Sequence, residues 1–161
     1  PDEFTVTPPA EVARFLNENN PANPSVTQYF TMVYGILDVP ARQLRYVAAG
    51  HAGPLVVPRG GEPVRHDSTG QPVGLLPEAT FTENTIELAP GERFYLYTDG
   101  VTECAGPRDE DFGGHRLGAA LGRGRAEPLE RSITRVLEEM AAWGGKTDFA
   151  DDVSVLGVEL E

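Results

Sequence analysis

The sequence predicts an α+β protein built from antiparallel sheets with helices packed on their outside. Strand-like runs follow one another through short turns, whereas the longer helical patterns occur near the start and near the end of the chain. Parallel sheets instead alternate each strand with a crossover helix. Because no repeat, low-complexity segment or domain boundary interrupts the 161 residues, we expect a single domain over residues 1–161. The expected strands cover residues 28–37, 44–49, 55–57, 81–88, 93–98 and 153–160.

Two pairs of these strands are expected to form hairpins. Residues 28–37 are apolar on both faces, which predicts a central strand that is covered on both sides. A short turn leads from this strand into strand 44–49, so the two are expected to pair. The tight turn at Pro90-Gly91 joins strands 81–88 and 93–98 as the second expected hairpin.

Apolar residues at helical spacing predict two longer helices. The first begins after Thr7, whose side chain is expected to cap it, and the two prolines that follow suit the first turn of a helix. Val12, Phe15 and Leu16 are expected to form its apolar stripe. The second helix covers about residues 128–143 and ends at a Gly-Gly pair. Its stripe is expected to belong to the core rather than to a cofactor site, and comprises Leu129, Ile133, Val136, Leu137 and Met140.

Composition and charge narrow the class of function. The net charge of −12 repels phosphate backbones, so nucleic acid is excluded as an expected partner. No apolar run is long enough to cross a bilayer and no signal-peptide pattern occurs, so we expect a cytoplasmic protein. The single cysteine, Cys104, excludes an internal disulfide and indicates a reducing compartment. Because its acidic neighbour Glu103 disfavours the thiolate, we expect no catalytic role for this thiol.

The strongest candidate for a functional residue is Asp99. The residues before it alternate as in a strand, and aromatic residues favour that pleated surface. The pattern stops at Thr98-Asp99-Gly100, because Asp disfavours regular strand and Gly permits backbone geometry closed to other residues. A carboxylate at the end of a buried strand suits a metal ligand or a general base. An ordinary Asp-Gly turn is an equally good interpretation of this stretch alone.

A second acidic site, Asp151-Asp152, directly precedes the last strand. If strands 93–98 and 153–160 are antiparallel neighbours, the end of one lies beside the start of the other, and their carboxylates meet. Clustered carboxylates repel one another unless a cation lies between them, and ligands that are all oxygen suit Mg²⁺ or Mn²⁺. The spacing therefore predicts a metal site, with a solvated acidic surface as the alternative.

Two further polar features are weaker candidates. His51 lies between small residues, where it could donate a hydrogen bond to a phosphate or act as an acid. Since nothing nearby completes a catalytic pair, a structural turn histidine bonded to the backbone is the favoured interpretation. The acidic run at 109–114 lacks the spacing and the closing Glu of a calcium loop, so we interpret it as a solvated loop.

Four segments taken together resemble the SpoIIE-like bacterial branch of the PPM, or type 2C, metal-dependent serine/threonine phosphatases. They follow one another in the order of that family and span nearly all of the chain. The segments are YFTMVYGILD at 29–38, YVAAGHAGP at 46–54, LYTDGVTE at 96–103 and DDVSV at 151–155.

The resemblance implies a fold and a metal centre. The fold is a β-sandwich of two antiparallel sheets with helices on both outer faces, a four-layer αββα arrangement that is expected to be incomplete at the N-terminus. The centre holds two Mn²⁺ or Mg²⁺ ions, with Asp99 and Asp151 as the matching ligands and Asp152 as a lesser candidate. His51 and Gly100 are implied on the side of the substrate.

The resemblance also implies a function. Such a protein removes phosphate from a phosphoserine or phosphothreonine of a partner, often an anti-sigma-factor antagonist, with a sensor or receiver domain upstream. The alternative is a non-catalytic phosphatase-like module that regulates by contact. Two N-terminal motifs of the family do not occur in these residues: a Gly-Gly-Asp motif, whose Asp bridges the metals, and an Asp-containing Gly-His-Gly segment. We therefore expect the chain to enter the fold at the helix around 10–16, to bind metal weakly and to show little phosphatase activity.

Overall fold

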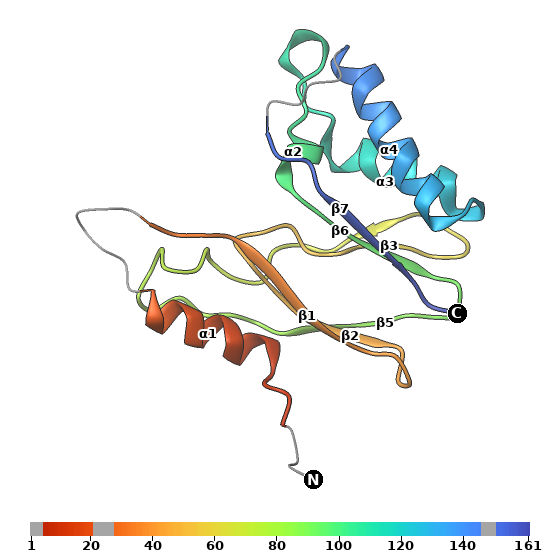
Figure 1. Cartoon of the computed structure of the whole chain (residues 1–161). Coiled ribbons are helices and arrows are strands. Elements are labelled where there is room, and N and C mark those ends of the chain that lie inside the picture. The colour runs from red at the N-terminus through yellow and green to blue at the C-terminus, as the bar shows by residue number, and fades with distance from the viewer. Residues whose placement is uncertain (1–4, 21–27, 146–150) are drawn as a thin grey trace. The chain divides into compact units, whose positions relative to one another are not determined.

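A computed structural model describes residues 5–20, 28–145 and 151–161. The chain divides into two compact units, the first from residues 1–53 and 67–87 and the second from residues 54–66 and 88–161. Each unit contains one antiparallel sheet with its own helices (Figure 1). The expected α+β class with antiparallel sheets is thereby confirmed. The expectation of a single domain over 1–161 stays a prediction.

The first unit contains the helix α1 and a three-stranded sheet in the order β1-β2-β5. The first expected hairpin is confirmed, because β1 and β2 pair from Met32 opposite Ala49 to Asp38 opposite Gln43. Its turn is held by the Asp38 carboxylate, which accepts a hydrogen bond from the Ala41 amide at 2.9 Å. The bounds are α1 Pro9–Asn19, β1 Met32–Asp38, β2 Gln43–Ala49 and β5 Asn84–Glu87.

The prediction that β1 is a central strand covered on both sides is wrong. In the described part of the chain β1 lies at the edge of its sheet, and its residues are half-buried or exposed. The adjacent strand β2 is the buried one, with Tyr46 and Val47 on its two faces both covered. An apolar pattern on both faces therefore does not determine which strand occupies the centre, since that depends on pairing.

The second expected hairpin is also wrong. β5 pairs with β2 of the first sheet, whereas β6 (Arg93–Tyr97) pairs with β3 and β7 of the second sheet. The turn between them is tight, as expected, with Gly91 at a φ of 75°. The backbone carbonyl of its last residue, Glu92, accepts a hydrogen bond from the Leu160 amide at 3.2 Å. The C-terminal segment with β7, and not β5, therefore pairs beside β6.

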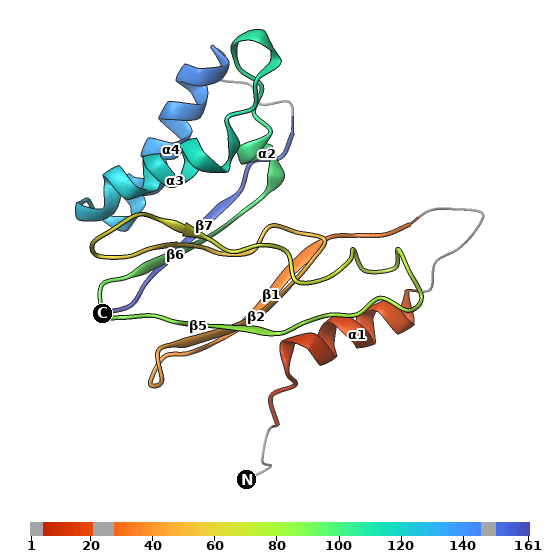
Figure 2. The ribbon, with the colours of Figure 1, turned by 180° about the vertical axis from the view of Figure 1, so that it is seen from behind.

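Helix α1 begins one residue later than expected and buries a different face. Its N-cap is Pro8 and no side chain caps it, so the expected role of Thr7 is wrong. Phe15, expected in the apolar stripe, is 63% exposed, whereas Ala13 and the polar Asn17 are buried. α1 packs against the sheet of the first unit, where it contacts β2 (Figure 2).

The orientation of α1 is set by hydrogen bonds of Asn17. Its side-chain amide donates to the carbonyls of Leu76 and Pro77, at 3.0 and 3.3 Å, and its side-chain oxygen accepts from the Gly74 amide at 2.8 Å. A buried amide has to find such partners because leaving it unpaired costs about 1–3 kcal/mol. The helix consequently turns Asn17 inward and leaves Phe15 exposed.

The second unit contains a four-stranded sheet in the order β4-β3-β6-β7, with α3 and α4 packed on one face (Figure 1). The expected helix at 128–143 is confirmed as α4, which ends before Gly145 in the left-handed conformation. The bounds are β3 Leu55–Val57, β4 Val64–Arg65, α2 Asp99–Thr102, α3 Gly113–Arg123, α4 Leu129–Gly144 and β7 Val155–Glu159, with 3₁₀ turns at Pro107–Asp109 and Gly124–Ala126.

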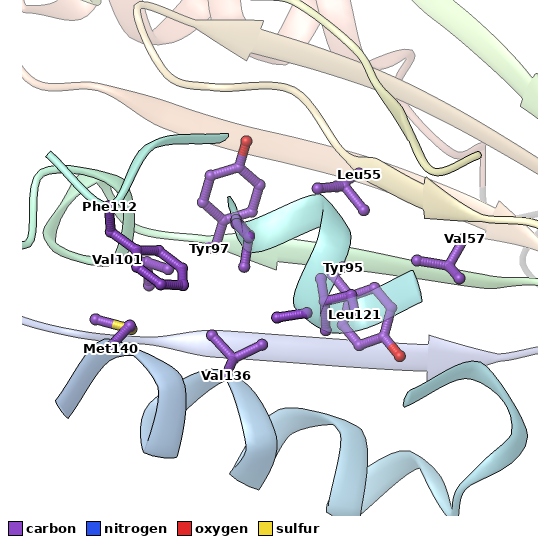
Figure 3. Close-up of a cluster of buried hydrophobic side chains, with 11 residues drawn as sticks. Leu55, Val57, Tyr95, Tyr97, Val101, Phe112, Leu121, Val136 and Met140 are labelled. Atoms are coloured by element: carbon purple, nitrogen blue, oxygen red, sulfur yellow. The ribbon is translucent and has the colours of Figure 1, made fainter. Parts of the chain in front are cut away.

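The core of this unit lies between the sheet and the helices (Figure 3). Val136 and Met140 of the predicted stripe of α4 are fully buried, whereas Leu137 is 38% exposed. A polar contact crosses this core, because the Tyr95 hydroxyl lies 2.9 Å from the Ser132 hydroxyl, and both residues are fully buried. The buried apolar cluster is Leu55, Val57, Tyr95, Tyr97, Val101, Phe112, Leu117, Ala120, Leu121, Val136 and Met140. None of the helices that the structure describes is both long and apolar enough to span a membrane.

Candidate metal centre

Asp99 is placed by the end of a buried strand. All but one residue of β6 are buried, and Thr98 then serves as the N-cap of the one-turn helix α2. Asp99 is therefore the first residue of a helical turn, where a carboxylate is favoured near the unpaired backbone N–H groups. The Asp99 side chain itself is exposed.

Asp151 and Asp152 reach the same end of the sheet from the start of β7. β6 and β7 are antiparallel neighbours with Tyr97 opposite Val155, so the condition that the sequence set for the two acidic sites to meet is fulfilled. We call Asp99, Asp151 and Asp152 the acidic edge. Figure 1 shows α2 and the start of β7 at the same end of the β6–β7 pair.

Thr98 joins the two segments that carry the acidic edge. Its backbone N–H donates to the Ser154 carbonyl at 3.1 Å. Its hydroxyl donates to the Asp152 carbonyl at 2.8 Å and accepts from the Ser154 amide at 2.9 Å. One side chain thus extends the β6–β7 pairing up to the acidic residues. Sequence reasoning missed this role of Thr98, although a hydroxyl residue directly before Asp-Gly at a strand end was a visible signal.

Gly100 lets the two segments approach closely. A Cβ atom at this position would lie 2.5 Å from the carbonyl oxygen of Asp152 and 3.1 Å from its carbonyl carbon. Real Cβ contacts to backbone are not that short, so only glycine fits here. Gly100 is therefore needed for spacing, not for an unusual φ.

The carboxylates of the acidic edge are oriented by their own backbone. Asp99 Oδ1 accepts a hydrogen bond from the Gly100 amide at 3.1 Å, and Asp151 Oδ1 accepts one from the Asp152 amide at 2.7 Å. All three acidic residues are exposed. Desolvation therefore gives no reason why these carboxylates should require a cation.

The carboxylates of the acidic edge are the type of ligand that a hard cation prefers, but they are few. Carboxylate oxygens are the ligands that Mg²⁺ and Mn²⁺ prefer. Across residues 5–20, 28–145 and 151–161, no group of three or more His, Cys, Asp and Glu side chains is arranged to hold a metal ion. The assignment of Asp99, Asp151 and Asp152 as metal ligands stays a prediction.

His51 belongs to the first unit, whereas the acidic edge belongs to the second. Its ring Nδ1 lies 2.9 Å from the carbonyl oxygen of the next residue, Ala52, as the favoured interpretation of a structural turn histidine expects. The preceding Gly50 has a φ of 66° and its amide donates to the Gly70 carbonyl at 2.8 Å, so this turn is fixed by the backbone. A substrate-side role of His51 stays a prediction.

The segment after α2 is tied to helices α3 and α4. Ala105 and Asp111 form an isolated antiparallel bridge, so residues 105–111 close a loop. The Arg116 guanidinium lies 3.8 Å from the ring centroid of Trp143, whose indole N–H donates to the Glu110 carbonyl at 3.2 Å. Asp109, Glu110 and Asp111 are exposed, as a solvated loop predicts. The expected loop at 109–114 ends there, because Phe112 is buried in the core and Gly113 and Gly114 begin α3.

Cys104 is half-buried in this segment, and burial raises the pKa of its thiol. The raised pKa keeps the thiol protonated to a higher pH in the folded chain than in the unfolded chain. We expect the pH midpoint of alkylation by iodoacetamide to be higher for the native protein than for the same protein in urea. Equal midpoints, or a loss of activity of a hundredfold or more in Cys104→Ser of the full-length protein, contradict an inert Cys104.

The comparisons with known proteins agree with the geometry. The family model described as Stage II sporulation protein E (SpoIIE) matches residues 4–161. Among curated proteins, the chain is similar to Protein IcfG of Synechocystis sp. (strain ATCC 27184 / PCC 6803 / Kazusa), with 37% identity over 92 residues, which is 57% of this chain and 14% of IcfG. The chain thus spans a small part of that relative.

Solved phosphatase domains share the fold. The SiaA-PP2C domain of Pseudomonas aeruginosa superposes with a TM-score of 0.83 at 21% identity, covering 96% of this chain and 61% of that one. The RsbU and RsbW domains of Rv1364c from Mycobacterium tuberculosis give 0.68 at 25% identity, covering 80% and 36%. The phosphatase domain of SpoIIE from Bacillus subtilis, presoaked with Mn, gives 0.64 at 16% identity, covering 81% and 56%.

The family expected from the four sequence motifs is the one that the family model matches over nearly the whole chain. The fold of the solved relatives agrees with it independently of sequence identity. The chain belongs to the SpoIIE family, whose structurally similar relatives are type 2C (PP2C) phosphatase domains.

Proposed function

We propose that the protein is a metal-dependent protein serine/threonine phosphatase that acts on a phosphorylated partner protein in bacterial signalling. The observation that carries the proposal is the acidic edge, where Thr98 and Gly100 hold the carboxylate-bearing ends of two strands against each other. The chain's membership of the SpoIIE family supports it, as do the structurally similar SiaA, RsbU and SpoIIE domains. We further propose that residues 1–161 act as a single phosphatase-like domain.

In this proposal Asp99 and Asp151 hold Mn²⁺ or Mg²⁺, and Asp152 is a lesser candidate. When bound, such ions supply Lewis-acid chemistry that lowers the pKa of water and offsets charge on phosphoryl oxygens. The chain's own residues supply position. The Thr98 hydroxyl fixes the Asp152 carbonyl, and the Gly100 and Asp152 amides each orient one carboxylate by donating to it.

The number of ligands limits what the acidic edge does alone. A two-metal centre needs carboxylates that hold the ions about 3.5–4 Å apart, and these hard ions exchange water for protein ligands only when several oxygens converge. Further carboxylates therefore have to join those of the acidic edge. We propose that the 161-residue chain binds metal weakly and turns over slowly.

The partner is proposed as a phosphoprotein, with an anti-sigma-factor antagonist as the first candidate and a sensor or receiver domain as the regulatory input. A non-catalytic module that regulates by contact is the second candidate. It is favoured by the exposure of Asp99 and Asp151, because solvated carboxylates that are bonded to their own backbone are stable without a cation.

Hydrolysis of a phosphoserine peptide, measured with and without millimolar Mn²⁺, separates the two candidates. We expect Mn²⁺-dependent turnover in the full-length protein, its loss in Asp99→Asn, and little turnover in the 161-residue chain. Asp67→Asn is the matched control, since Asp67 is an exposed aspartate outside the acidic edge. Turnover that does not depend on Mn²⁺, or that survives Asp99→Asn, overturns the proposed metal role of Asp99. Lack of turnover in the full-length protein overturns the enzyme assignment, and full turnover by the 161-residue chain overturns the expected weak binding.

A further inference from the structure

A polar pocket lies at the opposite end of the β6–β7 pair from the acidic edge. The strand register places Arg93 opposite Glu159 at this end and Tyr97 opposite Val155 at the other. The pocket has a volume of about 320 Å³, and its walls include Arg59, Arg93, Arg125, Gly91 and Glu159. We call it the arginine pocket. All of its residues belong to the second unit, and the proposed phosphatase chemistry uses none of them.

The arginine pocket carries an excess of positive charge in an acidic chain. Three guanidinium groups meet one carboxylate there, which leaves two formal positive charges, whereas the whole chain has a net charge of −12. The carboxylate is already engaged, because Glu159 accepts a hydrogen bond from Arg93 Nε at 2.7 Å. Within the described residues, neither Arg59 nor Arg125 forms an ion pair.

The wall at Arg93 is rigid. Arg93 is 6% exposed, and besides Glu159 it donates to the Gly124 carbonyl at 3.2 Å and to the Glu127 carbonyl at 2.6 Å. A guanidinium with several fixed hydrogen bonds has little rotational freedom left to lose when a ligand arrives. Arg93 therefore gives the pocket a fixed positive charge.

The other two arginines are positioned by glycines. Gly91 has a φ of 75°, and a Cβ atom there would lie 3.0 Å from Arg59 Nε, so the Arg59 side chain lies directly over the turn. Arg125 donates from Nε to the Gly122 carbonyl at 2.8 Å, which leaves its terminal amino groups for another acceptor. Both guanidinium groups thus line the pocket without a carboxylate of their own.

The chemistry of these walls identifies the class of ligand. Like charges held together repel one another, and a bound anion removes that repulsion. Planar guanidinium groups match phosphate-type oxyanions through paired N–H···O bonds. The volume lies at the lower end of the range for ligand pockets, about 300–1,000 Å³, which favours a small ligand. We propose that the arginine pocket binds a phosphate-type oxyanion, either free or as a small phosphomonoester.

The test measures anion binding in the 161-residue chain with EDTA present, so that no metal contributes. Thermal unfolding and calorimetric titration are followed with inorganic phosphate, sulfate, O-phosphoserine and, at matched ionic strength, chloride. The pocket variant is Arg59→Gln/Arg125→Gln, which leaves the buried Arg93 in place. The charge-matched control is Arg14→Gln/Arg42→Gln, two exposed arginines of the first unit.

We expect saturable stabilisation by phosphate and sulfate beyond that by chloride, with binding weakened about tenfold or more in the pocket variant and unchanged in the control variant. Tighter binding of O-phosphoserine than of phosphate identifies a phosphomonoester as the ligand, whereas weaker or equal binding identifies free phosphate. Stabilisation equal to that by chloride overturns the proposal, as does equal weakening in both double variants.

Discussion

Replacing Gly100 by alanine is expected to destabilise the protein by about 1–3 kcal/mol, because the added methyl group overpacks a contact between two backbones. The new Cβ atom would lie 2.5 Å from the Asp152 carbonyl oxygen, which the Thr98 hydroxyl holds in place. Either the start of β7 or the end of β6 has to move. Urea unfolding of the variant and the wild type measures the change.

The same substitution displaces the acidic edge, so in the full-length protein we expect Mn²⁺ affinity to fall about 10–100-fold. Gly118→Ala is the control, because a Cβ atom there would meet Pro63 at an ordinary 3.6 Å. Since Gly118 lies inside a helix, that change is expected to stabilise by about 0.5–1 kcal/mol. A Gly100→Ala variant as stable as wild type contradicts the close approach of the two segments.

Replacing Arg93 by methionine is expected to destabilise the protein by about 2–4 kcal/mol. The change removes three hydrogen bonds and leaves the carbonyls of Gly124 and Glu127 without their donor, at about 1–3 kcal/mol for each that stays buried. The Arg93 side chain is 7% exposed and Glu159 is 36% exposed, so the hydrogen bonds to carbonyls contribute more than the ion pair does. Urea unfolding measures this loss.

Arg131→Met is the matched control for Arg93→Met. Arg131 pairs with Glu138 at the same 2.7 Å, but both side chains are about half exposed. The interaction lowers the pKa of Glu138 and raises that of Arg131, yet solvent screens the pair. We expect no measurable change in unfolding free energy for Arg131→Met. Equal losses in the two variants would mean that the ion pair, and not burial, determines the contribution of Arg93.

Secondary-structure elements that are determined by residues close together in the chain could be predicted from the sequence. α4 has a long apolar stripe and a Gly-Gly stop, and the β1–β2 hairpin has a turn fixed by the Asp38 side chain. Both depend on residues close together in the chain, so periodicity and turn chemistry suffice. The approach of Asp99 to Asp151-Asp152 was predicted only on the condition that their two strands are antiparallel neighbours, and β6 and β7 fulfil that condition.

What the sequence could not predict depends on partners far along the chain. Asn17 is polar and no apolar pattern marks it for burial, yet hydrogen bonds to residues 74–77 bury it and turn Phe15 outward. Strand β6 follows β5 through a tight turn but pairs in another sheet, because β3 and the last strand, β7, lie on its two sides. At the acidic edge, the spacing role of Gly100 depends on the Asp152 backbone, 52 residues later in the sequence.

The β6–β7 ladder also sets a distance between opposite charges. It runs from Arg93 opposite Glu159 to Tyr97 opposite Val155, and at about 3.3 Å per residue its two ends lie about 13 Å apart. The Debye length is about 8 Å at physiological ionic strength and about 30 Å at 0.01 M salt. At physiological ionic strength, the electrostatic interaction between the carboxylates at one end and the arginines at the other is therefore largely screened. In dilute buffer they form a dipole along the strands, and charge bound at one end changes the ion affinity of the other.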